Sequence, residues 1–436
     1  DNPDVDNSAP DNDTGEPIDP AHPERTDAGS TERADTSEGN ESPDQCRSNG
    51  EPVNVATGEY FLPLTDVDLP GVLPLRLTHR HRSRYRWGRW LGPTTPSTFD
   101  ARAIVSDDLV SIVDADGTMT NFPKPQDDSV SRSVNDTDWE LRATATDGYQ
   151  LTHVRTLVSW FFIPIPELDG VDVTAGSIAV SAMTDRHHNR IRFVFDEHGR
   201  PSAVEHSAGY RIDVQCDGAR ILGYRLTAGV DGVPVDHQLC TFAYHRGHLA
   251  ASTNAVGATT RFGYDEAGRM TWWRDSIGME YWNRYDDLGR VTIQSGMNGV
   301  WSGRFDYRLR TAGPGSMTTY TDAVGATTLY GIDADNRVRQ EIDALGRITR
   351  TDYNDSRQPM VLTGADGLST RLHYNAFGDV ERIVGPDGAA TEVSYAGPGR
   401  PDQIVEPGPV TTRIAYTDNG SPLSVSDNAG AVTSYT

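Results

Sequence analysis

The chain has 436 residues, 36% of them hydrophobic, and a formal net charge of −24. This length exceeds one compact domain and predicts about three domains or one long array, while the low hydrophobic content suits sheets that bury one face. The negative charge argues against nucleic acid as a partner of the whole chain, because phosphate binding needs a basic surface. No apolar run approaches the ~20 residues of a membrane helix. The sequence therefore predicts no membrane span. No signal peptide is visible either.

The first 45 residues differ in composition from the rest. They carry 14 acidic residues against Arg25 and Arg33, and Val5 and Ile18 are their only large aliphatic residues. Such a segment cannot bury enough apolar surface to offset the entropy of ordering. Residues 1–45 are therefore predicted to be a disordered acidic linker, with a tether or an acidic interaction arm as the functional alternative.

Residues 46–120 contain short β-prone runs broken by Pro and Gly, which predict strands and turns. Three motifs follow one another there: Pro52-Val-Asn-Val-Ala-Thr-Gly58, Asp68-Leu-Pro-Gly71 and Leu73-Pro-Leu-Arg-Leu-Thr-His-Arg80. They resemble the N-terminal β-segment that opens Rhs proteins, a family of YD-repeat polymorphic toxins. In that family Gly-Pro-Gly-Trp and a Phe/Tyr-Asp pair follow. This chain has Leu91-Gly92-Pro93 and Phe99-Asp100, with Thr94-Thr95 in place of Gly-Trp.

Residues 75–87 are the most unusual patch of this segment, because every second position from Arg80 to Arg86 is an arginine. As a strand, the patch places Leu, His, Tyr and Trp on one face, and on the other face Arg76, Arg80, Arg82, Arg84 and Arg86. This arginine face is expected to be solvated or paired with carboxylates, and a surface for nucleic acid or an acidic cargo is the alternative. His79 and His81 share a face without an evident third ligand, so they predict no metal site.

Residues 121–240 are interpreted as irregular or degenerate β-repeats. Over residues 101–240 the expected strands are separated by turns at Asp116–Gly117, Asp147–Gly148 and Asp196–Gly199. His187 and His188 would point to opposite faces of a strand and predict no metal site.

Tyrosines recur through residues 241–436 at intervals of 20 to 23 residues, which is typical of a repeat array. The anchors are Tyr244, Tyr264, Tyr285, Tyr307, Tyr330, Tyr353, Tyr374, Tyr395 and Tyr416. Each opens a turn, most fully in Tyr264-Asp265-Glu-Ala-Gly268-Arg269 and Tyr285-Asp286-Asp-Leu-Gly289-Arg290. A second turn lies between anchors, as in Asp322-Ala-Val-Gly325 and Asp343-Ala-Leu-Gly346. Asp caps such a type I turn, and Gly supplies the positive φ at its exit.

Two turns in each repeat leave two strands of about six residues, so each repeat is predicted to be one β-hairpin. One hairpin is not stable alone, so successive hairpins must pair edge to edge in a long twisted, spiralling sheet. The fold class is therefore all-β. The YD-repeat family builds such a wall as a hollow β-cocoon around another part of the same protein, and the resemblance implies that this chain forms part of one.

The sequence predicts no catalytic residue, cofactor or metal site. The repeated Asp residues do not indicate a glycosidase, because an active site needs one unusual carboxylate pair and not many equivalent ones. The Tyr anchors could form an aromatic ladder for sugars together with Trp272, Trp273, Trp282 and Trp301, but cross-strand packing is the simpler interpretation. The chain has no G-x-S-x-G, H-E-x-x-H or Walker motif.

The three cysteines, Cys46, Cys216 and Cys240, are widely spaced and lack a C-x-x-C motif. This spacing predicts neither a zinc site nor a disulfide framework. Cys216 and Cys240 are expected to be unpaired buried thiols, with a bridge between neighbouring strands as the alternative.

The resemblance implies encapsulation and delivery as the function. The chain would be the structural shell portion of an Rhs-type polymorphic toxin of interbacterial competition, not an enzyme, and it would be secreted or at the cell surface of a bacterium. Its expected partners are a C-terminal toxin or further repeats of the same polypeptide, with a secretion apparatus as a further candidate. Toxin and self-cleavage segments would lie beyond residue 436. The alternative is a secreted or cell-surface YD-repeat adhesion module that binds glycans.

Overall fold

The computed structural model describes residues 47–49, 52–126, 129–133, 138–164, 176–309, 315–408 and 410–435. The acidic linker expected at 1–45 lies outside these residues. The described ranges consist of β-strands, turns and three short 3-10 helices, η1 (Thr98–Asp100), η3 (Val230–Gly232) and η4 (Met297–Gly299). Among them, no helix is long and apolar enough to span a membrane. The predicted all-β class is confirmed.

The N-terminal β-segment folds into small antiparallel sheets. β1 (Ser48–Asn49) pairs with β2 (Val53–Asn54), and β3 (Phe61–Leu69) pairs with β4 (Leu75–Arg82). A third sheet has the order β12-β5-β6-β7 and consists of β12 (Ser177–Ala179), β5 (Arg102–Val105), β6 (Leu109–Val113) and β7 (Met119–Pro123). Because β12 comes from later in the chain, it ties this sheet to the part that follows.

The other described strands form one antiparallel ladder of 28 strands, here called the wall. Apart from β12, the ladder follows chain order, as expected for successive hairpins. Its strands are β8 (Val130–Arg132), β9 (Trp139–Ala143), β10 (Tyr149–His153), β11 (Ser159–Phe162), β13 (Ala182–Thr184), β14 (Arg190–Phe195), β15 (Pro201–His206), β16 (Arg211–Asp217), β17 (Arg220–Ala228), β18 (Pro234–His245), β19 (His248–Asn254), β20 (Thr259–Tyr264), β21 (Met270–Arg274), β22 (Glu280–Tyr285), β23 (Val291–Gly296), β24 (Gly303–Leu309), β25 (Ser316–Asp322), β26 (Thr327–Ile332), β27 (Val338–Ile342), β28 (Ile348–Tyr353), β29 (Pro359–Thr363), β30 (Ser369–Tyr374), β31 (Val380–Val384), β32 (Ala390–Gly397), β33 (Arg400–Glu406), β34 (Val410–Tyr416), β35 (Pro422–Asp427) and β36 (Val432–Ser434).

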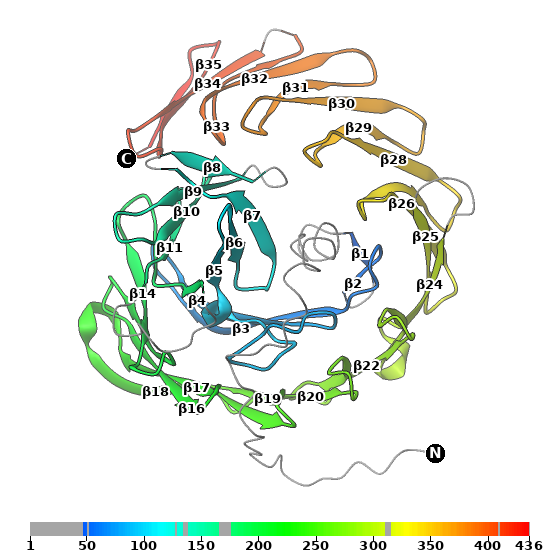
Figure 1. Cartoon of the computed structure of the whole chain (residues 1–436). Helices are drawn as coiled ribbons and strands as arrows, with labels where there is room; N and C mark the ends of the chain where they lie inside the picture. Colours follow the sequence, from blue (N-terminus) through cyan, green and yellow to red (C-terminus); the bar gives the residue numbers. More distant parts are fainter. Residues whose placement is uncertain are drawn as a thin grey trace.

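The wall curves round the N-terminal β-segment, and its last hairpins reach its first ones (Figure 1). Arg155, which follows β10, forms an ion pair with Asp379 of the turn before β31. Arg186 donates a hydrogen bond of 3.0 Å to the carbonyl oxygen of Gly420. β36 is the neighbour of β8, so the ladder closes on itself. The predicted twisted, spiralling sheet is confirmed.

The hairpin turns use Asp and Gly as expected. In the turn that starts at Asp275, the Gly278 amide donates to the Asp275 carbonyl oxygen (3.2 Å), and the Asp275 amide donates to the Met279 carbonyl oxygen (3.1 Å). The Asp275 carboxylate accepts the amides of Ile277 (3.0 Å) and Met279 (2.8 Å). Gly278 has φ +87°, a conformation that glycine adopts without a steric cost.

Two later turns depart from this pattern in one respect. At 364–367 and 385–388 the first position is glycine, and the capping aspartate is the third residue, Asp366 or Asp387. The Asp366 carboxylate still accepts the Leu368 amide (3.0 Å). The motifs Asp366-Gly367 and Asp387-Gly388 therefore end turns of the same length. In these turns the aspartate caps from the third position and not from the first.

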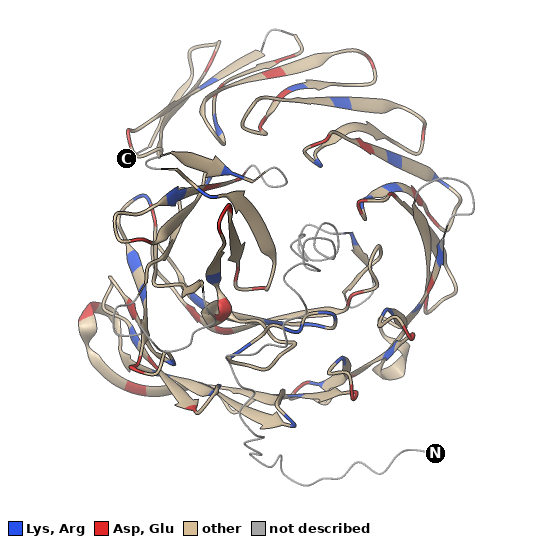
Figure 2. Cartoon of the chain, in the orientation of Figure 1, with Lys and Arg blue, Asp and Glu red and all other residues tan. Residues whose placement is uncertain are grey.

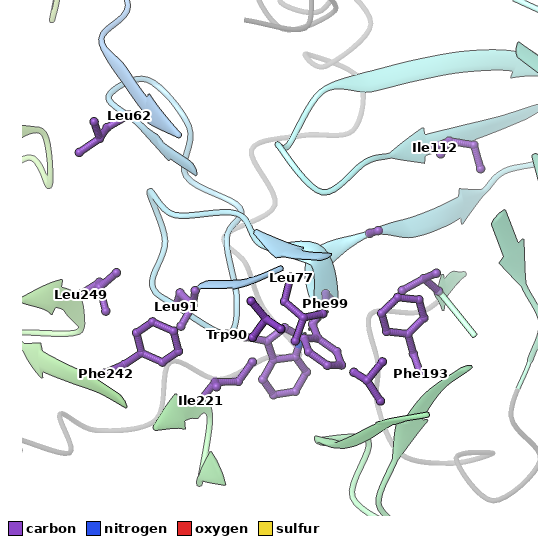
Figure 3. Close-up of a cluster of buried hydrophobic side chains, with 14 of the residues drawn as sticks. Leu62, Leu77, Trp90, Leu91, Phe99, Ile112, Phe193, Ile221, Phe242 and Leu249 are labelled. Atoms are coloured by element: carbon purple, nitrogen blue, oxygen red, sulfur yellow. Dashed lines mark hydrogen bonds between the residues drawn. The ribbon is translucent and has the colours of Figure 1, made fainter. Parts of the chain in front are cut away.

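The hydrophobic core lies between the N-terminal β-segment and the inner face of the wall. Figure 3 shows Trp90, Leu91 and Phe99 of the N-terminal β-segment surrounded by side chains of the wall, among them Phe193, Ile221, Phe242 and Leu249. The Phe99 ring meets that of Phe193 edge to face at 5.7 Å. Burial of this apolar surface, at about 25 cal/mol per Å², is what attaches the two parts to each other.

The core ends part-way along the wall. Among the described residues, no hydrophobic side chain beyond Ile332 is buried. β27 to β36 therefore expose both faces to some degree, and in Figure 1 β28 to β35 lie away from β3 and β4. The wall thus contributes buried hydrophobic side chains only as far as β26. At β27 the described contact is limited to the partly buried Val338 and to the ion pair of Glu341 with Arg47.

The wall begins at β8 and continues without interruption past residue 240. One detail of the sequence interpretation does not hold. His187 and His188 lie in a turn closed by the Asp185 and Asn189 backbones, and not in a strand. The expectation that they point to opposite faces of a strand is wrong, because Asp185 caps a turn and His188 takes its positive φ of 64°.

Candidate functional site

The motif residues Tyr264 to Arg269 and Tyr285 to Arg290 form a tie between successive repeats. The Arg269 guanidinium pairs with Asp265 of its own turn at 2.7 Å and lies 4.9 Å above the Tyr285 ring of the next repeat. The Tyr285 hydroxyl donates to the carbonyl oxygen of Met270 at 2.7 Å. Since Met270 follows Arg269 directly, each repeat holds the next by a cation–π contact and a hydrogen bond.

The same tie recurs along the wall. Arg290 lies 4.6 Å above Tyr307, and Arg337 lies 5.1 Å above Tyr353. Most anchors donate a hydroxyl hydrogen bond to the residue 15 positions earlier: Tyr264 to Leu249, Tyr353 to Val338, Tyr374 to Pro359, Tyr395 to Val380 and Tyr416 to Pro401. These hydroxyls are therefore engaged in hydrogen bonds within the wall.

The motif carboxylates act within their turns. Asp286 accepts the amides of Leu288 (3.0 Å) and Arg290 (2.9 Å) and pairs with the Arg290 guanidinium. Burial opposes its ionisation, but the amide and guanidinium of Arg290 together lower the pKa of Asp286 below its usual value. Asp322 and Asp343 cap the turns that end at Gly325 and Gly346 in the same way. Gly268 and Gly289 likewise take positive φ values in theirs.

The N-terminal β-segment docks on the two fullest copies of the motif. The Val291 amide donates to the Gly58 carbonyl oxygen at 2.9 Å, and the Met270 amide donates to Nε2 of His81 at 3.3 Å. A Cβ atom on Gly58 would lie 2.4 Å from Cβ of Arg290, so only glycine fits this approach. The sequence indicated that these two repeats are the most complete copies of the motif. Their role in docking could not be predicted, because it depends on contacts between residues far apart in the chain.

The arginine-rich patch is part of the same junction. Arg82 pairs with Glu59 at 2.9 Å with both side chains 5% exposed, and Arg80 pairs with Asp116 at 2.9 Å. Arg84 donates to the carbonyl oxygen of Thr57 (3.0 Å), and Arg86 donates to that of Ser83 (2.9 Å). The expected pairing with carboxylates is present at Arg80, Arg82 and, on the surface, Arg76 with Asp68.

The expected two-faced strand holds only as far as Arg82, where β4 ends. From Ser83 to Trp87 the chain turns, so the expectation that Tyr85 and Trp87 continue the histidine face is wrong. The Ser83 amide still donates to the carbonyl oxygen of Tyr60 at 2.9 Å, in register with the β3–β4 ladder. The Tyr85 amide then donates to the Arg82 carbonyl oxygen at 3.2 Å, which closes a turn.

Comparisons with known proteins agree with these features. The family model described as RHS Repeat matches residues 244–271, and the one described as Domain of unknown function (DUF6531) matches residues 50–122. The chain is 25% identical over 312 residues to "Probable deoxyribonuclease RhsB" of Dickeya dadantii (strain 3937), a match that covers 70% of this chain and 20% of that protein. It is 26% identical over 307 residues to "Probable deoxyribonuclease RhsA" of the same organism, covering 69% and 20%.

This chain contains an RHS repeat and is similar to Rhs proteins over about 70% of its length. It spans about a fifth of the length of the curated relatives that it matches. Among solved structures, the Tc holotoxin pore of Photorhabdus luminescens aligns with a TM-score of 0.43 at 12% identity, covering 75% of this chain and 19% of that one. TcdB2-TccC3-TEV aligns with a TM-score of 0.37 at 13% identity, covering 87% and 24%.

The structure also places most of the cysteines and histidines that were considered as candidate ligands. Cys216 and Cys240 are free thiols, and burial raises the pKa of Cys216 to about 12. Cys46 lies outside the described residues. His79 pairs with Asp66 at 2.7 Å, and within the described ranges no group of three or more His, Cys, Asp or Glu side chains could hold a metal ion.

Loss of the Tyr285 hydroxyl tests the tie. Tyr285→Phe leaves the Met270 carbonyl oxygen without this donor, so the free energy of unfolding should fall by about 1 kcal/mol. Urea denaturation followed by circular dichroism measures it. The exposed Tyr435 provides the control, since Tyr435→Phe should change stability by less than about 0.5 kcal/mol. Equal effects of the two substitutions would contradict a stabilising tie.

Breaking the buried ion pair of Arg82 with Glu59 should lower the free energy of unfolding more than loss of the Tyr285 hydroxyl does. Arg82→Met leaves the Glu59 carboxylate buried and uncompensated, so it should cost about 3–5 kcal/mol of unfolding free energy. The double variant Glu59→Gln/Arg82→Met should recover part of that loss. Arg76→Met, which breaks the exposed pair with Asp68, should cost at most about 1 kcal/mol. The interpretation fails if Arg76→Met and Arg82→Met destabilise the protein equally.

The buried His81 predicts a pH dependence of stability. Burial, and then the positive charges of His248, Arg86 and His79, keep the pKa of His81 well below 6.5. The unfolded chain therefore binds more protons than the folded one just below pH 6.5. Unfolding free energy should fall as the pH drops from 7 to 5.5, with a slope of at most about 1.4 kcal/mol per pH unit for this group.

Denaturation midpoints at several pH values check this expectation. His81→Gln should flatten the dependence, because its side chain does not titrate, whereas the exposed His237→Gln should leave it unchanged. A slope that persists undiminished in His81→Gln would show that another group is responsible.

Proposed function

We propose that the chain forms the shell portion of an Rhs-type polymorphic toxin, which encloses a C-terminal toxin segment of the same polypeptide and helps to deliver it. The observation that carries the proposal is the uncovered stretch of wall from β27 to β36, where no described hydrophobic side chain is buried. A single sheet layer needs packing on one face to be stable. Enclosed polypeptide supplies that cover.

The turns at one edge of the wall support the same conclusion. Four of them place a large aliphatic side chain at the third position of the turn. These side chains are the most exposed in the array: Val256 (86%), Ile277 (86%), Val324 (87%) and Leu345 (78%). Rows of exposed apolar side chains mark interaction sites. Further repeats or a partner segment packed along this edge would bury them.

The charge distribution also suits a shell. Figure 2 shows basic and acidic residues interspersed along the strands of the wall. Many of the arginines are paired across strands, as in Arg192 with Glu205 and Arg225 with Asp236. A wall of this kind offers enclosed protein no strong field of one sign. We assign no catalytic role to its residues, and a secreted or surface location goes with the proposal.

Protection from protease tests enclosure. In the full-length protein, the C-terminal segment should resist proteinase K for much longer than the same segment expressed alone, because the wall excludes the protease. Mass spectrometry of time points measures the difference. Arg155→Met, which removes the pair with the buried Asp379 where late hairpins meet early ones, should increase the cleavage rate.

The exposed pair of Arg211 with Asp213 offers a matched control, since Arg211→Met should leave the cleavage rate unchanged. Equal cleavage rates for the C-terminal segment inside the full-length protein and alone would rule out enclosure. Binding of the intact protein to glycan arrays, together with an unprotected C-terminal segment, would favour the adhesion function instead.

A further inference from the structure

A cavity of about 580 Å³ lies where the N-terminal β-segment meets the first strands of the wall. Trp139 of β9, Leu151 of β10, and Trp160 and Phe162 of β11 line one side of it, and Ile112 of β6 and Phe122 of β7 line another. In Figure 1, β5 to β7 lie inside the wall next to β9, β10 and β11. This volume falls within the range of about 300–1,000 Å³ that small-molecule sites occupy.

The lining is mainly aromatic and held in place. Phe122 and Phe162 are buried, whereas the two indoles are only partly covered. The Trp139 ring meets the His153 ring edge to face at 4.8 Å, and the Trp160 ring stacks on Phe193 at 6.4 Å. These contacts fix the orientation of both indoles before any ligand arrives, which limits the entropy lost on binding.

Polar groups gather at one end of the cavity, on β4 and on the turn between β6 and β7. Arg80 pairs with Asp116 at 2.9 Å, and the Asp114 carboxylate accepts the amides of Asp116 (3.0 Å) and Thr118 (2.9 Å). For Asp116, burial works against ionisation, but Asp114 and Arg80 lower its pKa to about 2.

The charges of Arg80 and Asp116 at this end cancel within their ion pair. The Asp114 carboxylate is already engaged by two amides of its own turn. An anion or a cation entering the cavity would lose its hydration without gaining an unpaired partner, which is costly in an apolar site. A neutral group that accepts or donates one hydrogen bond would meet no such cost.

We propose that this cavity is a binding site for a neutral ligand with a flat aromatic body and a single hydroxyl or carbonyl group. The body lies against Trp139 and Trp160, and the polar group lies at the Asp114 and Arg80 end. The site adjoins the ion pair of Arg82 and Glu59, because the Arg82 guanidinium also donates to the Asp116 carbonyl oxygen at 3.5 Å. It is independent of whether the wall encloses a toxin.

Isothermal titration of the whole chain with 1-naphthol tests the proposal. This probe is neutral, flat and carries one hydroxyl, so it should bind at a single site with a dissociation constant in the micromolar range. Naphthalene-2-sulfonate has the same body with a negative charge, and it should bind at least about tenfold more weakly, since its charge is left without a partner.

Substitutions locate the site. Thr120→Trp places an indole at a partly exposed position in the lining and should weaken 1-naphthol binding at least about tenfold by filling the cavity. Thr412→Trp, on β34 far along the wall, should leave binding unchanged. If Thr120→Trp does not fold, as judged by circular dichroism, Trp139→Ala serves in its place, with the exposed Trp282→Ala as its control.

Two results would overturn the site. One is the absence of saturable 1-naphthol binding to the folded chain. The other is binding that survives Thr120→Trp or Trp139→Ala undiminished, which would place the probe elsewhere on the protein. Tighter binding of naphthalene-2-sulfonate than of 1-naphthol would contradict the inferred neutral ligand.

Discussion

The structure depends on one constraint: no hairpin of the wall is stable without its neighbours. Backbone pairing joins consecutive hairpins, and the contact between an Arg of one repeat and a Tyr of the next keeps them in line. The Tyr285 hydroxyl reaches the Met270 carbonyl oxygen only when the two hairpins pair in this register. A slip of one residue would break this bond and send every side chain to the opposite face. Stability and register therefore come from the same contacts.

The N-terminal β-segment makes the two halves of the wall different. It packs against the inner face as far as β26, pairs Arg47 with Glu341 of β27, and is anchored by Gly58 and His81 at the repeats that begin with Tyr264 and Tyr285. Beyond β26 the repeats keep their turns and their Tyr hydrogen bonds, but their faces are not buried. The two halves share one local chemistry, so the difference between them lies in what covers them.

Much of the fold could be predicted from the sequence, because turn chemistry acts over a few residues. The Asp and Gly positions predicted the hairpins, and the Tyr spacing predicted the array. The hydrogen-bond partners of the Tyr anchors were missed, although for most anchors the partner lies 15 residues earlier, just after the preceding turn. The His187–His188 turn was also missed, since His188 occupies the positive φ position where Gly is usual.

The sequence by itself determined the all-β class, the turns and the repeat, since each of these depends on residues close together in the chain. Only the tertiary structure decided which repeats receive the N-terminal β-segment, that Arg80 and Arg82 are buried in ion pairs, and that an aromatic cavity forms beside β9 to β11. These features join residues that are far apart in the sequence, as Gly58 and Arg290 are. Such contacts depend on how whole surfaces fit together, and no local pattern encodes that fit.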